Sequence, residues 1–167
     1  MSLYNPSQDL TAVQAIMNSD NSILTLLDLS GQKLIDKANA YIAEKKKGNP
    51  AFTTTIEKAG ELVIAKNIIK RSQWSDLVGS DKRLCVCFLP SRKVRNESFF
   101  EEILEIDCHV PATEDYKAWQ IQEQVFKLLH KKKVNKRYLC AEPPLGELAT
   151  MSGFFCCGTR FKFYRNI

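Results

Sequence analysis

The sequence is poor in the residues that usually bind metals. It has two histidines, His109 and His130, and none of its six cysteines belongs to a CxxC pair. Structural zinc sites usually need such closely spaced ligands. Four of the cysteines lie in apolar, strand-like segments (Cys85 with Cys87, Cys156 with Cys157), where a free thiol is typically a small buried residue. The sequence therefore predicts reduced, buried thiols, with neither a metal nor another cofactor.

Motifs of common catalytic sites are also missing. The chain has no GxGxxG or GxxxxGK[ST] phosphate loop, no GxSxG nucleophile turn and no HExxH zinc motif. A row of acidic residues, Glu101, Glu102, Glu105 and Asp107, could serve a nuclease, but residues along one strand do not converge as a two-metal site requires. We therefore expect a protein that is not an enzyme, with a metal-dependent nuclease as the weaker alternative.

Long hydrophobic segments are absent, and the start, MSLYNPSQDL, lacks the basic and apolar parts of a secretory signal. We expect no membrane contact and synthesis in a cytosol. Hydrophobic residues make up 44% and charged residues 26% of the 167 residues, which is typical of one globular domain. The net charge of +5 is compatible with nucleic acid nearby but does not require it.

Helical periodicity dominates the first part of the chain. Apolar residues recur at helical spacing through residues 1–50, and Gly48-Asn49-Pro50 ends that region. Three consecutive threonines favour a connector over residues 51–58. A further helix is predicted over about 57–74. We divide the chain into a helical region with its connector, 1–58, and an α+β region, 59–167, within one compact unit.

The segment FFEEILEIDCHVP, residues 99–111, raises the question of whether Asp107, Cys108 and His109 form a chemical site. Successive strand residues point to opposite faces. Leu104, Ile106, Cys108 and Val110 then share an apolar face, while Asp107 and His109 share a charged one. The alternation predicts a half-buried strand in which Cys108 is a core residue and its two neighbours face outward.

The remaining elements complete a β-β-α-β-β unit. RLCVCFLP, from Arg83, predicts a central strand that pairs antiparallel with the strand just described. A long amphipathic helix is predicted to follow Thr113 as its N-cap and to end with Lys131–Lys133. Strands are expected at 137–142 and 153–164. The predicted fold is α+β, a mostly antiparallel four-stranded sheet with the helix packed on one face.

Basic residues gather in two places. One group surrounds the first hairpin and includes Arg92, Lys93 and Arg95. The other follows the long helix and consists of Lys131, Lys132, Lys133, Lys136 and Arg137. Lysines at the end of a helix often serve only solubility and the helix dipole. The alternative is a positive surface that faces DNA phosphates, in a small nucleic-acid-binding protein.

Residues from about 83 to 167 resemble the tail-terminator, or tail-completion, family of tailed bacteriophages. The resemblance rests on RLCVCFLPSRKVRN, on EEILEIDCHVPATEDYKAWQIQEQVFKLLHKKKVNKRYLCAE and on LGELATMSGFFCCGTRFKFY. The positions that match the family pattern are Val110, Tyr116, Ala118, Ile121, Val125, Leu128, Leu129 and His130, followed by the aromatic-basic-aromatic end Phe161-Lys162-Phe163. The region of residues 1–75 is longer and more helical than the minimal family fold leads one to expect.

The resemblance implies a structural virion protein at the head–tail joint. Family members form rings, commonly hexamers, that cap the tail tube, bind the head connector or neck proteins and let double-stranded DNA pass through the lumen. Charged strand faces and loops would then fix the contacts between subunits. The candidate interface residues are Arg92, Lys93, Arg95, Glu105, Asp107, His109, Arg160 and Lys162.

Overall fold

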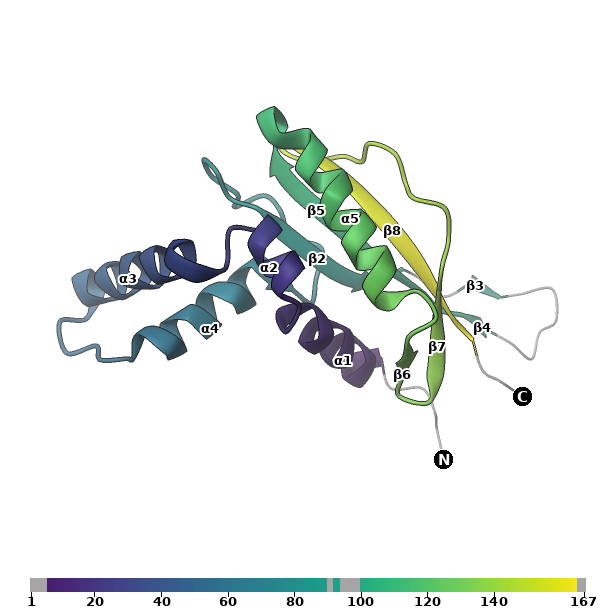
Figure 1. Ribbon diagram of the computed structural model, residues 1–167, viewed down its shortest axis with the longest axis horizontal. Helices are drawn as coiled ribbons and strands as arrows, with labels where there is room; N and C mark the ends of the chain where they lie inside the picture. The colour runs from purple at the N-terminus through teal and green to yellow at the C-terminus, as the bar shows by residue number, and fades with distance from the viewer. Residues whose placement is uncertain (1–5, 90–91, 94–99, 165–167) are drawn as a thin grey trace.

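The computed structural model describes residues 6–89, 92–93 and 100–164. Within them the chain forms helices around a six-stranded sheet, with a separate strand pair (Figure 1). The helices are α1 (Pro6–Asn18), α2 (Asn21–Leu26), α3 (Gly31–Gly48), α4 (Ile56–Asn67), the short 3-10 helix η1 (Ala112–Glu114) and α5 (Asp115–Leu129). The strands are β1 (Ile68–Ile69), β2 (Arg83–Phe88), β3 (Arg92–Lys93), β4 (Phe100–Glu101), β5 (Ile103–Pro111), β6 (Lys133–Val134), β7 (Arg137–Ala141) and β8 (Phe154–Tyr164). No helix in this part of the chain combines the length and hydropathy of a membrane span.

The main sheet has the strand order β1-β2-β5-β8-β7-β6. β1 runs parallel to β2, and the other neighbours run antiparallel. The predicted antiparallel pairing is confirmed for the four long strands, β2, β5, β8 and β7, but the prediction of four strands in all is wrong. The two further strands, β1 and β6, have two residues each, which is too short for alternation to reveal them in the sequence.

Helix α5 packs on one face of this sheet, as predicted. Ala118, Ile121, Val125 and Leu129 are fully buried against the sheet. The buried Gln122 donates from its side-chain amide to the carbonyls of Ile106 (2.9 Å) and Cys157 (3.0 Å), and so bonds the helix to β5 and β8. Helix α5 therefore has both apolar and polar anchors on the sheet.

The predicted ends of this helix are wrong. Thr113 lies inside η1, and the N-cap of α5 is Glu114, whose side chain makes no capping hydrogen bond. The helix ends at Leu129 because His130 takes an extended conformation. The lysines that were expected in its last turn instead lead into β6. Asn135 and Lys136, both with positive φ, form the tight turn between β6 and β7, as left-handed turn positions of a hairpin require.

The first two helices belong to the same core as the sheet. Val13, Met17 and Ile23 are fully buried in the cluster that also contains Ile106 of β5. The Asp20 carboxylate caps α2 by accepting from the Ile23 amide at 2.8 Å. The division placed between residues 58 and 59 falls inside α4.

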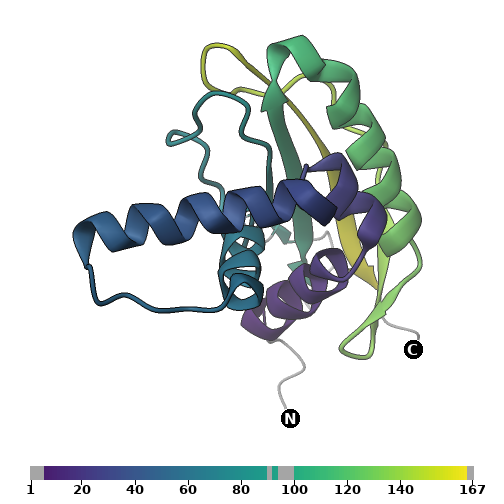
Figure 2. The same ribbon diagram turned by 60° about the vertical axis from the view of Figure 1, so that its left-hand side comes forward.

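Helices α3 and α4 form a hairpin that projects from the rest of the molecule (Figures 1 and 2). We refer to residues 31–67 as the helical arm. In α3, all of whose residues are described, only Ala38 is buried. Ile35, Ile56 and Leu62 are 40%, 49% and 48% exposed. The helix predicted to reach residue 74 ends at Asn67, because Ile68 and Ile69 pair with β2 instead.

Candidate functional site

The face of the sheet opposite α5 carries a group of titratable side chains from three strands. It consists of Arg83, Cys85 and Cys87 from β2, Glu105, Asp107 and His109 from β5, and Cys156, Gly158 and Arg160 from β8. We call it the polar sheet face. The register places Cys87 and Arg160 on either side of Glu105, and Cys85 and Gly158 on either side of Asp107. Strand alternation thus brings residues from three separate segments together.

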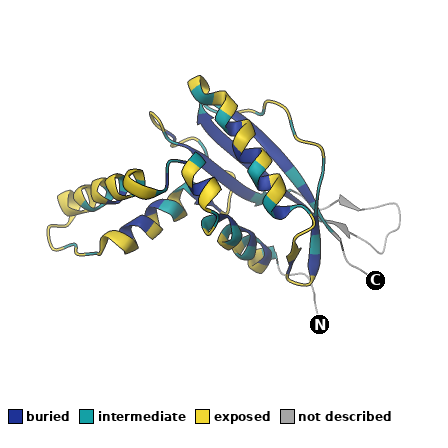
Figure 3. Cartoon of the chain, in the orientation of Figure 1, coloured by how far each residue is buried: buried dark blue, intermediate teal, exposed yellow. Residues whose placement is uncertain are grey.

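Two irregular segments cover this face. Segment 70–81 contributes the Gln73 carbonyl, which accepts from Arg83 at 3.0 Å, and Trp74, which stacks on His109. Segment 142–153 follows the edge of β8 through a Leu145–Gly158 bridge and places Thr150 beside His109. The sheet strands are accordingly buried along much of their length (Figure 3).

The prediction that Asp107 and His109 face outward is therefore wrong. Asp107 is 7% and His109 is 1% exposed. His109 Nδ1 lies 2.9 Å from the Thr150 hydroxyl, and its ring centroid is 6.0 Å from that of Trp74. Burial, with a smaller effect of Arg83, lowers the pKa of His109 to about 4, so the imidazole is neutral at pH 7. The two side chains share a face, but that face is an interior one.

Asp107 has an unusual environment for a carboxyl group. Burial, and then the neighbouring Glu105, raise its pKa to about 7. Its Oδ1 has no hydrogen-bond partner among the described residues. A Cβ atom on Gly158 would collide with this oxygen and would lie 3.3 Å from the Ile106 carbonyl. Glycine is therefore needed at position 158 to make room for the Asp107 carboxyl.

Cys87, Glu105 and Asp107 form a compact group. One ligand atom from each, the Cys87 sulfur and a carboxylate oxygen of the other two, lies within 4.8 Å of the others. Arg160 Nε donates to Glu105 Oε2 at 2.6 Å. Burial, and then the two carboxyls, raise the pKa of the Cys87 thiol to about 12. Sequence reasoning missed this group because Cys87 is 18 positions away from Glu105, and only the register between β2 and β5 joins them.

The other predicted interface residues lie on β5, on β8 and around β3. Glu105 and Arg160 form the ion pair just described, and Lys162 pairs with Glu142 at 2.7 Å. Arg92 and Lys93 form β3, which pairs with β4 in the small second sheet. Arg95 lies outside the described residues. Two of the eight residues, Asp107 and His109, are buried, so they do not lie on an exposed surface of the subunit.

The predicted DNA-facing group is divided. Lys131, Lys132, Lys133 and Lys136 are exposed around the turns that flank β6. Arg137 does not belong with them, because it is 7% exposed and its guanidinium pairs with Asp9 and Glu102. Its expected position on a DNA-facing surface is wrong, since it holds α1 against the sheet. Glu102, one of the acidic residues considered above for a nuclease site, is therefore paired with Arg137.

An aromatic surface lies along α5, beside β8 and segment 142–153. Trp119 and Phe126 are 42% and 39% exposed and border a groove of about 200 Å³ that also contacts Pro144 and Thr159. The Trp119 ring packs 5.9 Å from Phe155, and the Phe126 ring stacks 4.8 Å from His130. Both exposed rings are held in place by these neighbours. We call this feature the α5 groove.

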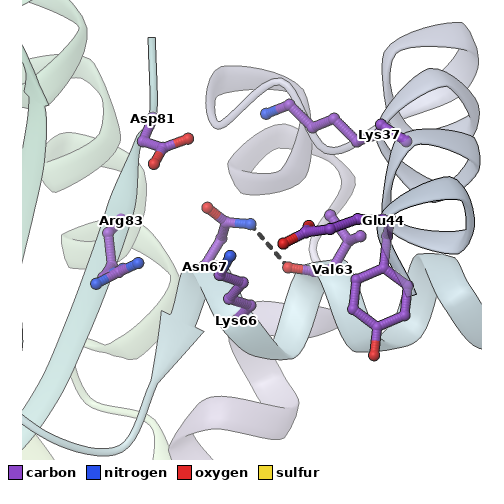
Figure 4. Close-up of a pocket in the computed structure, with 9 residues that line it drawn as sticks. Lys37, Glu44, Val63, Lys66, Asn67, Asp81 and Arg83 are labelled. Atoms are coloured by element: carbon purple, nitrogen blue, oxygen red, sulfur yellow. Dashed lines mark hydrogen bonds between the residues drawn. The ribbon is translucent and has the colours of Figure 1, made fainter. Parts of the chain in front are cut away.

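A polar pocket lies between the helical arm and β2 (Figure 4). It measures about 240 Å³, and its charged lining consists of Lys37, Glu44, Lys66, Asp81 and Arg83. Burial lowers the pKa of Lys37. The lining mixes both signs of charge, so it does not favour an anionic or a cationic ligand.

Comparison with known proteins gives no assignment. Neither a family model nor a curated protein matches the chain.

Proposed function

We propose that the chain is a structural protein of a tailed bacteriophage virion, located at the head–tail joint. In this role it forms a ring, most simply a hexamer, that caps the tail tube, binds the connector and surrounds the DNA. The observation that carries the proposal is the presence of two exposed apolar surfaces on separate parts of the chain, the helical arm and the α5 groove. The sequence resemblance to tail terminators supports the same role.

The segments that carry the two surfaces have opposite formal net charges. The helical arm contains seven lysines and four acidic residues. Segments 112–129 and 142–153, which surround the α5 groove, contain five acidic residues and two lysines. Opposite charges around apolar centres favour association in one orientation. Contact between the arm of one subunit and the groove of the next is heterologous, and such contacts close into rings when the rotation permits.

The test is self-association of the purified protein by sedimentation velocity over a range of concentrations. Leu62→Asp on the arm and Trp119→Glu at the groove are each expected to shift the population to monomer. Val78→Asp is the matched control, because Val78 is 70% exposed but lies in a turn outside both surfaces. Equal association of the wild type and all three variants would contradict the proposed interface.

A DNA-binding protein is the second candidate, favoured by the exposed group of Lys131, Lys132, Lys133 and Lys136. If this group binds phosphates, affinity for duplex DNA should fall steeply with salt. Replacing Lys132 and Lys136 by Gln should reduce the slope by about two. Negligible DNA binding at low salt would exclude this candidate.

A further inference from the structure

A second inference concerns the polar sheet face and is independent of the assembly role. The Cys87 sulfur and one carboxylate oxygen each from Glu105 and Asp107 lie within 4.8 Å of one another. Cys87 and Glu105 are direct partners across β2 and β5, and Asp107 is two residues further along the same face of β5. The three side chains therefore come from paired strands, which hold them more firmly than loops would.

The group has more acidic than basic side chains. Arg160 is the cation that contacts it, through its 2.6 Å hydrogen bond to Glu105 Oε2. Two carboxyls and a thiol share this one guanidinium among the described residues. Asp107 is more than nine-tenths buried, and its Oδ1 lacks a hydrogen-bond partner there. A buried carboxylate oxygen without a partner is costly unless a proton or a metal ion accompanies it.

We propose that Cys87, Glu105 and Asp107 bind one divalent metal ion of the zinc class. Bonds of about 2.3 Å to sulfur and about 2.2 Å to oxygen place two ligands of a tetrahedral zinc ion about 3.6 Å apart. The three ligand atoms lie within 4.8 Å of one another, so metal binding requires side-chain rotations that bring them closer by up to about 1 Å. A thiolate ligand favours zinc or cobalt over magnesium and calcium, which take oxygen ligands.

The surroundings allow a metal to enter and define the ligand set. Cys87 is partly exposed, which gives an ion a route from solvent. Other nearby groups have partners of their own: His109 Nδ1 contacts Thr150, and the Cys85 thiol donates to the Gln73 carbonyl at 3.5 Å. Binding would release the Cys87 proton to solvent, because a coordinated thiol is deprotonated.

The experiment is a titration of the reduced, metal-free full-length protein with Co²⁺ and then Zn²⁺. Cobalt bound by a thiolate gives a sulfur-to-metal charge-transfer absorption, and zinc should displace it at one equivalent. Cys87→Ser should abolish the band, and Asp107→Asn should weaken zinc binding at least tenfold. Cys140→Ser is the control, because Cys140 is a partly exposed cysteine on β7, away from the group.

The outcomes are distinct. Absence of a band in the wild type, or a band that survives in Cys87→Ser, would overturn the proposal. Glu105→Gln provides a second ligand variant if Asp107→Asn fails to fold, and circular dichroism checks both. Sedimentation of the metal-free protein keeps this test separate from that of ring assembly, since the proposed interface lies on the arm and α5.

Discussion

The two faces of the main sheet are both buried, but by different means. On the α5 side, Ile106, Cys108 and Phe161 meet apolar residues of α1, α2 and α5 in a continuous core. On the other side, Asp107 and His109 lie under irregular segments, where His109 contacts the Thr150 hydroxyl and the Trp74 ring. The first face provides stability through apolar burial, whereas the second keeps titratable groups close together. We therefore expect ligand binding on the second face. Mutations on the first face should cause the larger losses in the free energy of unfolding.

The largest effect should come from the α5 face. Ile106→Ala removes a fully buried side chain and should lower the free energy of unfolding by about 3 kcal/mol. On the polar face, Cys87→Ala should cost about 1 kcal/mol or less. Chemical denaturation of metal-free protein measures both. Equal losses of unfolding free energy in the two variants would contradict the proposed difference in stability between the two faces.

Gly158→Ala should give the next largest effect. A strand glycine normally gains stability from alanine, but here the added Cβ meets Asp107 Oδ1 and lies 3.1 Å from Leu148 Cδ1. We expect a loss of about 2 kcal/mol. Asp107→Ala in the same chain should recover at least half of it, as a double-mutant cycle would show. Additive losses would mean that the collision with Asp107 does not matter.

A third prediction concerns the ion pairs at the end of the sheet where β2 begins. Burial opposes ionisation of Asp28, but hydrogen bonds from Lys33 and Lys82 outweigh it and lower the pKa of Asp28 to about 2. Its stabilising contribution is present above the unfolded pKa of about 3.8 and disappears as the pH falls through about 2. Asp28→Asn should therefore cost about 1–2 kcal/mol at pH 7 and little at pH 2.

Asparagine is the suitable replacement for Asp28, because the residue has φ of +58° and asparagine tolerates that conformation. Denaturation of both proteins across this pH range tests the prediction. A stability difference that does not change between pH 7 and pH 2 would exclude the charge as its cause.

The smallest effect should come from the hydrogen bond that orients His109. Thr150→Val removes the hydroxyl 2.9 Å from His109 Nδ1 and should cost about 1 kcal/mol. Thr53→Val, at an exposed position of the connector, should change stability much less. No difference between the two variants would show that segment 142–153 does not hold the histidine through this bond.

The sequence was informative about which residues share a face but not about what covers that face. Alternation correctly grouped Leu104, Ile106, Cys108 and Val110 as core residues. It also grouped Asp107 with His109, but exposure was inferred from polarity, and the covering segments 70–81 and 142–153 have no periodic signal. The Cys87–Glu105–Asp107 group could be recognised only from the register between β2 and β5, which a single sequence does not give.

Ion pairs between residues far apart in the sequence could not be predicted from sequence patterns either. Arg137 was grouped with exposed lysines, because its partners Asp9 and Glu102 lie 128 and 35 positions away. The helical arm was predicted as helices, but its projection from the body follows from tertiary packing. The exposed Leu62 and the groove beside Trp119 could therefore be proposed as an interface only after the fold was known.

Electron microscopy of the negatively stained protein over a concentration series tests the central functional claim most directly. We predict closed rings with one subunit count and a central opening wide enough for a DNA duplex, and their loss in Leu62→Asp but not in Val78→Asp. Monomers at every concentration of the wild type, or rings that persist unchanged in Leu62→Asp, would contradict the proposed arm-to-groove assembly.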